Sequence, residues 1–165
     1  AGIVPDIVVM SKSIGGIGMP LAIVLHTDEL DDWKPGEHNG TFRGNQLSFV
    51  AGKAAIDYLL ENDVEAETRR KGELVKKYVT EEILPLDSRL ELRGIGLIWG
   101  IDFGAVDSSL TEEVIEKCFE KKLICECAGR EGSVVKIMPP LVIDDDLLLE
   151  GLARVKRSIE EVLNK

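Results

Sequence analysis

The feature that most limits how this chain can fold is a long segment without proline, residues 47–84. Apolar residues recur in it at intervals of three and four, as on one face of a helix, and alanines and charged residues fill the remaining positions. Pro85 ends the segment. We therefore predict one long helix or two collinear helices over residues 47–84, with a break near Asn62-Asp63.

Two short apolar runs precede this helical segment. Residues 7–10 are rich in β-branched side chains, which is typical of a strand covered on both faces in a parallel or mixed sheet between helices. Residues 21–25 are a second strand candidate, and the glycines within 15–18 predict a turn between the two. Residues 26–46 show no period and predict a loop; a loop this long inside a compact domain is usually functional.

The residues that follow the helical segment have the pattern of a compact α+β unit. Glycine-interrupted strand character over 90–103 precedes Ser109, which with Glu112 forms a candidate capping box for a helix to about residue 121. Residues 123–128 and 134–138 predict a strand pair, and the aspartates at 144–146 favour the start of a final helix.

The predicted elements give a fold class of α/β plus α+β in three parts. Residues 1–46 are expected to be the tail of a larger α/β domain, residues 47–84 a long linking helix, and residues 85–165 a small C-terminal α+β domain. The first residue is Ala1 rather than methionine, so we expect a piece of a longer protein.

The charge balance narrows the function classes. The chain has 20 Lys and Arg against 30 Asp and Glu, a formal net charge of -10, which disfavours a sequence-independent grip on nucleic acid or on anionic membranes. It has no apolar run near the roughly 20 residues of a membrane-spanning helix and no signal-peptide pattern. We expect a cytoplasmic protein with neither nucleic acid nor membrane as a partner.

The cysteines do not predict a special site. Cys118, Cys125 and Cys127 are odd in number, and a C-x-C pair alone is a weak metal signal because tetrahedral zinc requires four ligands. We interpret them as ordinary thiols, buried or half-buried, and predict no metal site.

The first candidate for chemistry is Lys12, at the end of an apolar run and just before a glycine turn. An amine at such a position can be partly desolvated and still face a cavity, which lowers its pKa and makes it nucleophilic. A lysine that simply leaves a strand into solvent fits the same spacing.

The second candidate is the segment 38–45, whose Thr41 hydroxyl and small neighbours could hold a phosphate at the start of the following helix. The same residue types are also preferred in a turn and helix N-cap. Arg93 and Lys136 are cations within apolar strands, where each could pair with a neighbouring carboxylate or bind a substrate carboxylate.

Six short motifs, taken together and in order, are far more specific to one protein family than any one of them alone. They are Pro5-Asp6-Ile7, Ser11-Lys12, Gly16-x-Gly18-x-Pro20-Leu21-Ala22, Gly40-Thr41-Phe42-Arg43-Gly44-Asn45, Arg93-Gly94-x-Gly96-Leu97 and Pro139-Pro140-Leu141-Val142-Ile143. Their order along essentially the whole chain resembles the class III pyridoxal-phosphate-dependent aminotransferases, which have the fold-type I architecture. Within that class, the stretches around Lys12 and Thr41 look most like diaminobutyrate–2-oxoglutarate aminotransferases.

The resemblance implies a role for three residues. Lys12 matches the lysine that binds pyridoxal 5'-phosphate covalently and then moves a proton between substrate and cofactor. Thr41 matches the threonine that hydrogen-bonds the cofactor phosphate, typically across a dimer interface. Lys136 falls where several relatives carry an arginine for a substrate carboxylate, and a lysine lacks the planar two-point grip. Arg93 is interpreted as structural.

The resemblance also implies an activity and what this chain lacks. The expected substrates are an amino acid donor and 2-oxoglutarate, with the terminal amine of L-2,4-diaminobutyrate transferred, or the reverse from glutamate to aspartate semialdehyde, by a homodimer or higher oligomer. The glycine-rich phosphate loop and the aspartate that pairs with the pyridine nitrogen are not among these residues, so we expect the chain alone to be inactive.

Two alternatives to this function stay open. The donor could be ornithine, acetylornithine or 4-aminobutyrate, because these enzymes differ mainly in pocket residues. The chain could instead be a non-catalytic α+β interaction or dimerisation module, in which case Lys12 would be exposed and dispensable.

Overall fold

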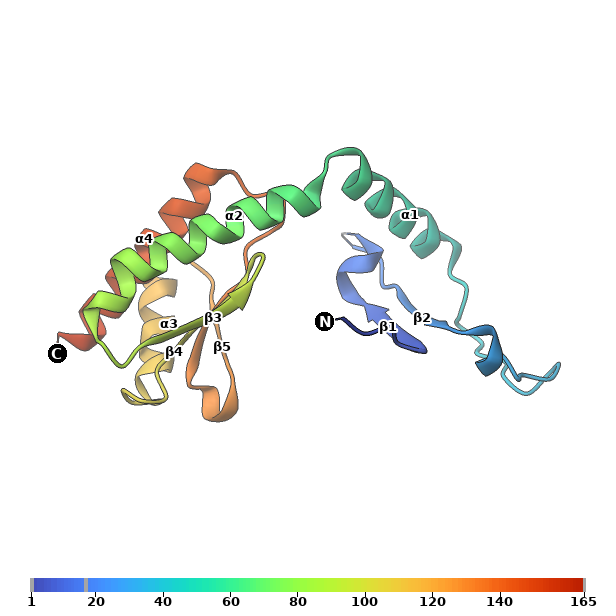
Figure 1. Cartoon of the computed structure of the whole chain (residues 1–165), viewed down its shortest axis with the longest axis horizontal. Coiled ribbons are helices and arrows are strands. Elements are labelled where there is room, and N and C mark those ends of the chain that lie inside the picture. Colours follow the sequence, from blue (N-terminus) through green and yellow to red (C-terminus); the bar gives the residue numbers. More distant parts are fainter. Residues whose placement is uncertain (1, 17, 165) are drawn as a thin grey trace. The chain divides into compact units, whose positions relative to one another are not determined.

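The computed structural model describes residues 2–16 and 18–164, and these form two compact units, Ala1–Asp63 and Val64–Lys165 (Figure 1). The helical segment is divided where the units meet in the sequence. Helix α1 (Gln46–Glu61) ends at Asn62, and helix α2 (Val64–Tyr78) begins after Asp63, whose φ of 45° interrupts the helical backbone. The predicted break near Asn62-Asp63 is confirmed.

The first unit contains one antiparallel strand pair. Strand β1 (Ile7–Ser11) pairs with β2 (Ala22–His26), and the 3-10 turn η1 (Lys12–Gly15) follows β1. Both predicted strands are confirmed, the second shifted by one residue. The loop predicted over residues 26–46 is observed over residues 27–45, since His26 ends β2 and Gln46 begins α1; its one regular element is the short 3-10 turn η2 (Asp28–Leu30).

The prediction that the first strand is covered on both faces is wrong for this chain. The side chains of Ile7 and Val9 are 54% and 70% exposed, whereas Val8 and Met10 between them are half-buried. Within the described residues β1 pairs only with β2, in an antiparallel rather than a parallel ladder. A two-stranded ladder leaves one of its faces without a covering layer, and an uninterrupted apolar run does not reveal that.

The second unit is built on a four-stranded antiparallel sheet. Its strand order is β3 (Glu91–Ile95), β4 (Ile98–Asp102), β6 (Val134–Ile137) and β5 (Glu126–Ala128). The glycine-interrupted run of residues 90–103 is thus a hairpin, and its turn passes through Gly96 at a φ of 56°. The predicted pair of strands over 123–128 and 134–138 is confirmed, each somewhat shorter than expected.

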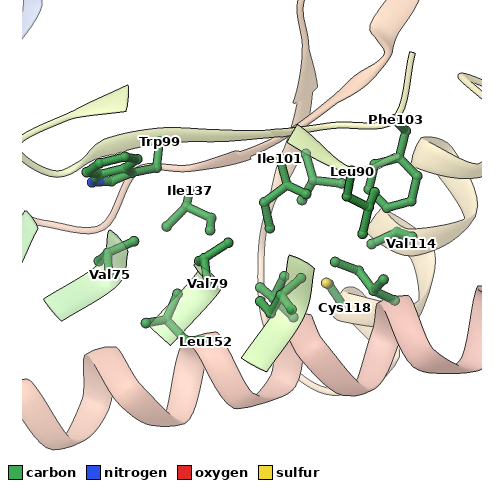
Figure 2. Packing of buried hydrophobic residues seen from close by; sticks show 14 of the residues in the cluster. Val75, Val79, Leu90, Trp99, Ile101, Phe103, Val114, Cys118, Ile137 and Leu152 are labelled. Atoms are coloured by element: carbon green, nitrogen blue, oxygen red, sulfur yellow. The ribbon is translucent and has the colours of Figure 1, made fainter. Parts of the chain in front are cut away.

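Three helices complete this unit: α2, α3 (Leu110–Glu120) and α4 (Asp145–Leu163). Directly after α2 the chain makes a π-helical turn, η3 (Val79–Ile83), and a 3-10 turn, η4 (Leu84–Leu86), that contains Pro85. A third turn, η5 (Arg130–Gly132), lies between β5 and β6. Figure 2 shows the core between the sheet and the helices, with Trp99 and Ile137 facing Val75 and Leu152.

The predicted capping box at α3 is wrong. Ser109 has helical dihedrals and makes no side-chain cap; its hydroxyl donates instead to the Asp107 carboxylate at 2.7 Å. The Thr111 hydroxyl donates to the Ser108 carbonyl at 2.9 Å. An N-cap hydroxyl accepts a hydrogen bond from a helix N–H and needs extended backbone, whereas Ser109 is already helical; the Asp107 carboxylate instead accepts the Ser109 backbone N–H at 2.9 Å.

The final helix begins at the predicted aspartates. Asp144 is its N-cap residue, and Asp145 in the first turn accepts two hydrogen bonds, of 2.8 and 2.7 Å, from the Arg70 guanidinium on α2. The aspartates therefore join α4 to α2 as well as favouring the helix dipole.

Candidate functional site

Lys12 lies directly after β1, as the first residue of η1, and is exposed. Its φ is 59°, in the left-handed region that β-carbon sterics make unfavourable for residues other than glycine. Such backbone costs on the order of 1–3 kcal/mol and is concentrated at functional positions, where surrounding contacts hold it. Asp63, Lys122 and Glu131 are the other described residues besides glycine with a positive φ, and the role of Lys12 stays a prediction.

The contacts that hold η1 come from α1. The α1 backbone approaches η1 at Gly52, where an added β-carbon would lie 2.5 Å from Leu21 Cδ2 and 3.1 Å from the Ile14 carbonyl oxygen. On the other side, an added β-carbon at Gly16 would lie 3.3 Å from Ala55 Cβ. Small residues on both surfaces therefore allow the turn that follows Lys12 to lie close against the helix.

Lys12 lines an open hollow of about 560 Å³ in the first unit. The other lining residues are Pro20, Leu21, Ala22, Phe42 and Asn45. This volume is within the range of small-molecule sites. The structure therefore brings Lys12 together with two residues of the segment 38–45, which the sequence separates from it by about thirty positions.

Thr41 is exposed and is not a lining residue of that hollow. Its neighbour Asn45 is the N-cap of α1, where the side-chain oxygen accepts hydrogen bonds from the backbone N–H groups of Leu47 and Ser48 at 3.0 and 3.3 Å. The turn-and-cap interpretation of this segment is confirmed for Asn45, and the helix start it creates adjoins the hollow.

Sequence reasoning missed Ser48. Its side chain is buried, and its hydroxyl is the one buried side-chain polar atom without a hydrogen-bond partner within residues 2–16 and 18–164. It lines a second hollow that shares Pro20, Leu21, Ala22, Phe42 and Asn45 with the first. A serine in an apolar helical stretch gives no signal of this in the sequence.

Lys136 lies on β6 in the second unit, half-buried. It stands opposite Glu126 in the β5–β6 register, and its ammonium forms an ion pair with that carboxylate. Lys136 also lines an apolar hollow of about 220 Å³. Arg93 forms an ion pair with Asp102 on the neighbouring strand β4, which agrees with its structural interpretation.

Two features are absent from the described part of the chain. No three His, Cys, Asp or Glu side chains in it come together as a metal site would require. None of its helices is long and apolar enough to cross a membrane.

The family comparison covers nearly the whole chain. Residues 1–159 match the model of the class III aminotransferases. The chain belongs to this family, whose members depend on pyridoxal phosphate.

Curated relatives with more than 40% identity are named for one particular aminotransferase reaction. The chain is 43% identical to a diaminobutyrate–2-oxoglutarate transaminase of Wolinella succinogenes over 100% of its own length and 38% of that protein, and 45% identical to one of Streptomyces coelicolor over 98% and 38%. The chain thus spans well under half the length of the curated relatives it matches.

Solved structures show the same fold in part. An ornithine aminotransferase of Toxoplasma gondii matches with a TM-score of 0.87 and 27% identity, over 98% of this chain and 39% of that one. An acetylornithine aminotransferase of Elizabethkingia anophelis matches with a TM-score of 0.84 and 27% identity, over 96% and 42%. The chain is a mixed α/β segment that corresponds to about two fifths of such structures.

Proposed function

We propose that this chain is the part of a pyridoxal-phosphate-dependent diaminobutyrate–2-oxoglutarate aminotransferase that carries the cofactor lysine. The observation that supports it most is Lys12, which has strained backbone and lines a hollow with residues from the segment around Thr41. The identity of over 40% to curated diaminobutyrate transaminases supports the donor.

The hollow fits this cofactor because Lys12 offers it a primary amine, which is the group that an aldehyde cofactor requires of the protein. When bound, pyridoxal phosphate supplies an electron sink for the carbon that carries the transferred amine. Lys12 would hold it covalently through Nζ, and once free, the same Nζ would accept and return the proton at the substrate carbon. The turn packed on α1 would fix the origin of the Lys12 side chain during both tasks.

Two other residues would contribute binding rather than chemistry. The Thr41 hydroxyl would donate a hydrogen bond to a phosphate oxygen, as part of a homo-oligomer in which one subunit completes the site of another. Lys136 would attract a substrate carboxylate as a point charge, but its pairing with Glu126 partly neutralises that charge. We therefore expect Lys136 to affect substrate binding far less than Lys12 affects turnover.

The test of the cofactor lysine uses the complete open reading frame that encodes this chain. The protein is incubated with pyridoxal phosphate, reduced with borohydride and digested, and the pyridoxyl adduct is located by mass spectrometry. We expect the adduct on Lys12, its loss in Lys12→Arg and its retention in Lys34→Arg, a control lysine in the loop of the same unit. An adduct scattered over surface lysines would instead support the non-catalytic interaction module.

A second experiment tests the donor. The complete protein is supplied with 2-oxoglutarate and, separately, with diaminobutyrate, ornithine, acetylornithine or 4-aminobutyrate, and glutamate formation is measured. We expect diaminobutyrate to give the highest kcat/KM. A higher value for ornithine would assign the chain to the function named for the solved structures that it resembles.

The glutamate assay also tests whether residues outside this chain are needed to complete the cofactor site. Because the chain spans 38% of its curated relatives, we propose that residues outside it complete the cofactor site. We expect no transamination by residues 1–165 alone, and turnover by those residues equal to that of the complete protein would refute this.

A further inference from the structure

Two of the three cysteines lie close together in the second unit, although seven positions separate them. Cys118 is on α3, is 0% exposed and belongs to the hydrophobic core, where Figure 2 shows it beside Val114. Cys125 lies in the segment that leads into β5 and packs against the same core. The two side chains are close enough for each thiol to shift the pKa of the other.

The end of α3 explains this proximity. Lys122 adopts a left-handed φ of 61°, so the chain reverses there; its N–H donates to the Phe119 carbonyl, and the N–H of Leu123 donates to the Cys118 carbonyl, both at 2.9 Å. This is the hydrogen-bond pattern of a Schellman motif. Along the extended segment that follows, burial alternates, and Leu123, Cys125 and Cys127 share the half-buried side, with Cys125 the first cysteine after the turn. The turn therefore returns the second thiol to the first.

Solvent approaches this pair from the Cys125 side. Cys125 lines both the hollow that contains Lys136 and a second hollow beside Phe119 and Ile124. The third cysteine, Cys127, is on β5 opposite Val135, where burial and the charge of Glu112 on α3 raise its pKa, and neither of the other thiols contributes to that shift. The geometry thus singles out one pair and leaves Cys127 outside it.

The contact between the thiols also affects their ionisation. The S–H of Cys125 stabilises the thiolate of Cys118, which lowers the pKa of Cys118 to about 7, and Lys121 adds a favourable charge. The pKa of Cys125 is raised because it would lose its proton beside an ionised neighbour. The charge of the pair therefore resides on Cys118, and Cys125 stays the protonated thiol.

We propose that Cys118 and Cys125 form a reversible disulfide switch that responds to peroxides. The thiolate attacks one peroxide oxygen, the O–O bond breaks, and the products are a sulfenic acid and, after protonation, one water. The second thiol then attacks the sulfenic sulfur, the S–S bond forms, and a second water leaves. The two thiols lose two electrons and two protons in all, and hydrogen peroxide is reduced to two waters.

The bond would join the end of α3 to the entry of β5, which is one of the two edge strands of the sheet. An edge strand has a neighbour on one side only, so this link would fasten β5 from its free end. The loop that it closes is short, and we expect a correspondingly small change in stability.

The test uses the full chain, reduced, freed of reductant, treated with hydrogen peroxide, quenched in acid and alkylated in denaturant. Trypsin cuts after Lys117, Lys121, Lys122 and Arg130, so it separates Cys118 from Cys125 but leaves Cys125 and Cys127 in one peptide. The variant Cys127→Ser removes this ambiguity, because any link between the two peptides must then join Cys118 to Cys125. The matched variant Cys125→Ser changes the other half-buried thiol of the same segment.

We expect the wild-type chain to fall from three alkylated thiols to one, and Cys127→Ser from two to none, with the linked peptides released by dithiothreitol. Cys125→Ser should keep both of its thiols under the same dose. The proposal is overturned if Cys127→Ser forms no linked peptides, if Cys125→Ser forms as many as Cys127→Ser, or if the oxidised chains are linked between molecules on a non-reducing gel.

Discussion

The two compact units of this chain use apolar residues in opposite ways. Among the described residues, every buried apolar side chain belongs to residues 64–164, where the sheet and three helices enclose one core. In residues 2–63 the buried positions are small, namely Gly15, Ser48 and Gly52, while Ile7, Val9, Val24, Leu47 and Val50 are more than half exposed. A strand or helix with a suitable sequence is therefore not by itself a folded domain.

The difference teaches where each unit obtains its stability. The second unit buries its own apolar area and can be stabilised by it at roughly 25 cal/mol per Å². The first unit exposes contiguous apolar side chains, which in proteins generally mark surfaces that another layer covers. This fits a chain that spans 38% of its curated relatives.

The largest expected effect comes from separating the units. A peptide of residues 64–165 should unfold cooperatively, because its core is complete, whereas a peptide of residues 1–63 should show no cooperative transition. Near-ultraviolet circular dichroism with denaturant titration measures both. A cooperative transition in the shorter peptide would contradict the conclusion that residues 1–63 lack a core of their own.

A pair of truncating substitutions sharpens the comparison next. Phe103→Ala removes a ring that is fully buried in the core and should lower the free energy of unfolding by about 3–5 kcal/mol. Val9→Ala removes methyl groups that are largely in solvent and should change it by less than about 0.5 kcal/mol. Urea denaturation of the full chain measures both, and equal losses would mean that Val9 is covered in solution.

Two glycine substitutions probe helix packing in each unit. At Gly72 on α2 an added β-carbon would overlap the Gly96 carbonyl, which is backbone and cannot turn aside, so Gly72→Ala should destabilise by about 1–3 kcal/mol. At Gly52 on α1 the closest atom is the end of the Leu21 side chain, which can rotate. The gain in helix propensity, about 1 kcal/mol, then offsets much of the strain, so Gly52→Ala should cost less. Thermal unfolding should rank Gly72→Ala below Gly52→Ala, and the reverse order would contradict this packing.

The smallest effect is the pH dependence of a surface contact in the second unit. The Asp87 carboxylate accepts hydrogen bonds from the Arg89 side chain and backbone, which lower its pKa from 3.8 to about 2. Because the folded-state pKa is depressed, this stabilisation is present above pH 3.8 and is lost as pH falls toward about 2. Asp87→Asn should therefore be less stable than wild type at neutral pH, with the difference vanishing in acid. A difference that stays constant down to pH 2 would assign the effect to geometry rather than charge.

Several parts of the fold and of the candidate site could be predicted from the sequence because their signals are local. The helical period, the break near Asn62 and the strand pairs follow from spacing and turn residues. The prediction that Lys12 stands at a strand end was of the same kind and is confirmed in place, whereas its role stays a prediction. The capping box failed because Ser109 is itself helical and the Asp107 carboxylate, which the pattern did not weigh, accepts its backbone N–H.

The sequence by itself determined which segments become helices and strands, since backbone period and turn chemistry act over a few residues, and it placed Lys12 at a strand end. Only the tertiary structure decided which apolar runs are buried, that residues 42 and 45 share a hollow with Lys12, and that Cys118 meets Cys125. These depend on which surfaces meet, through single left-handed residues such as Lys122 and close approaches such as Gly72 to Gly96. Contacts between distant residues have no period, and a one-dimensional pattern therefore cannot record them.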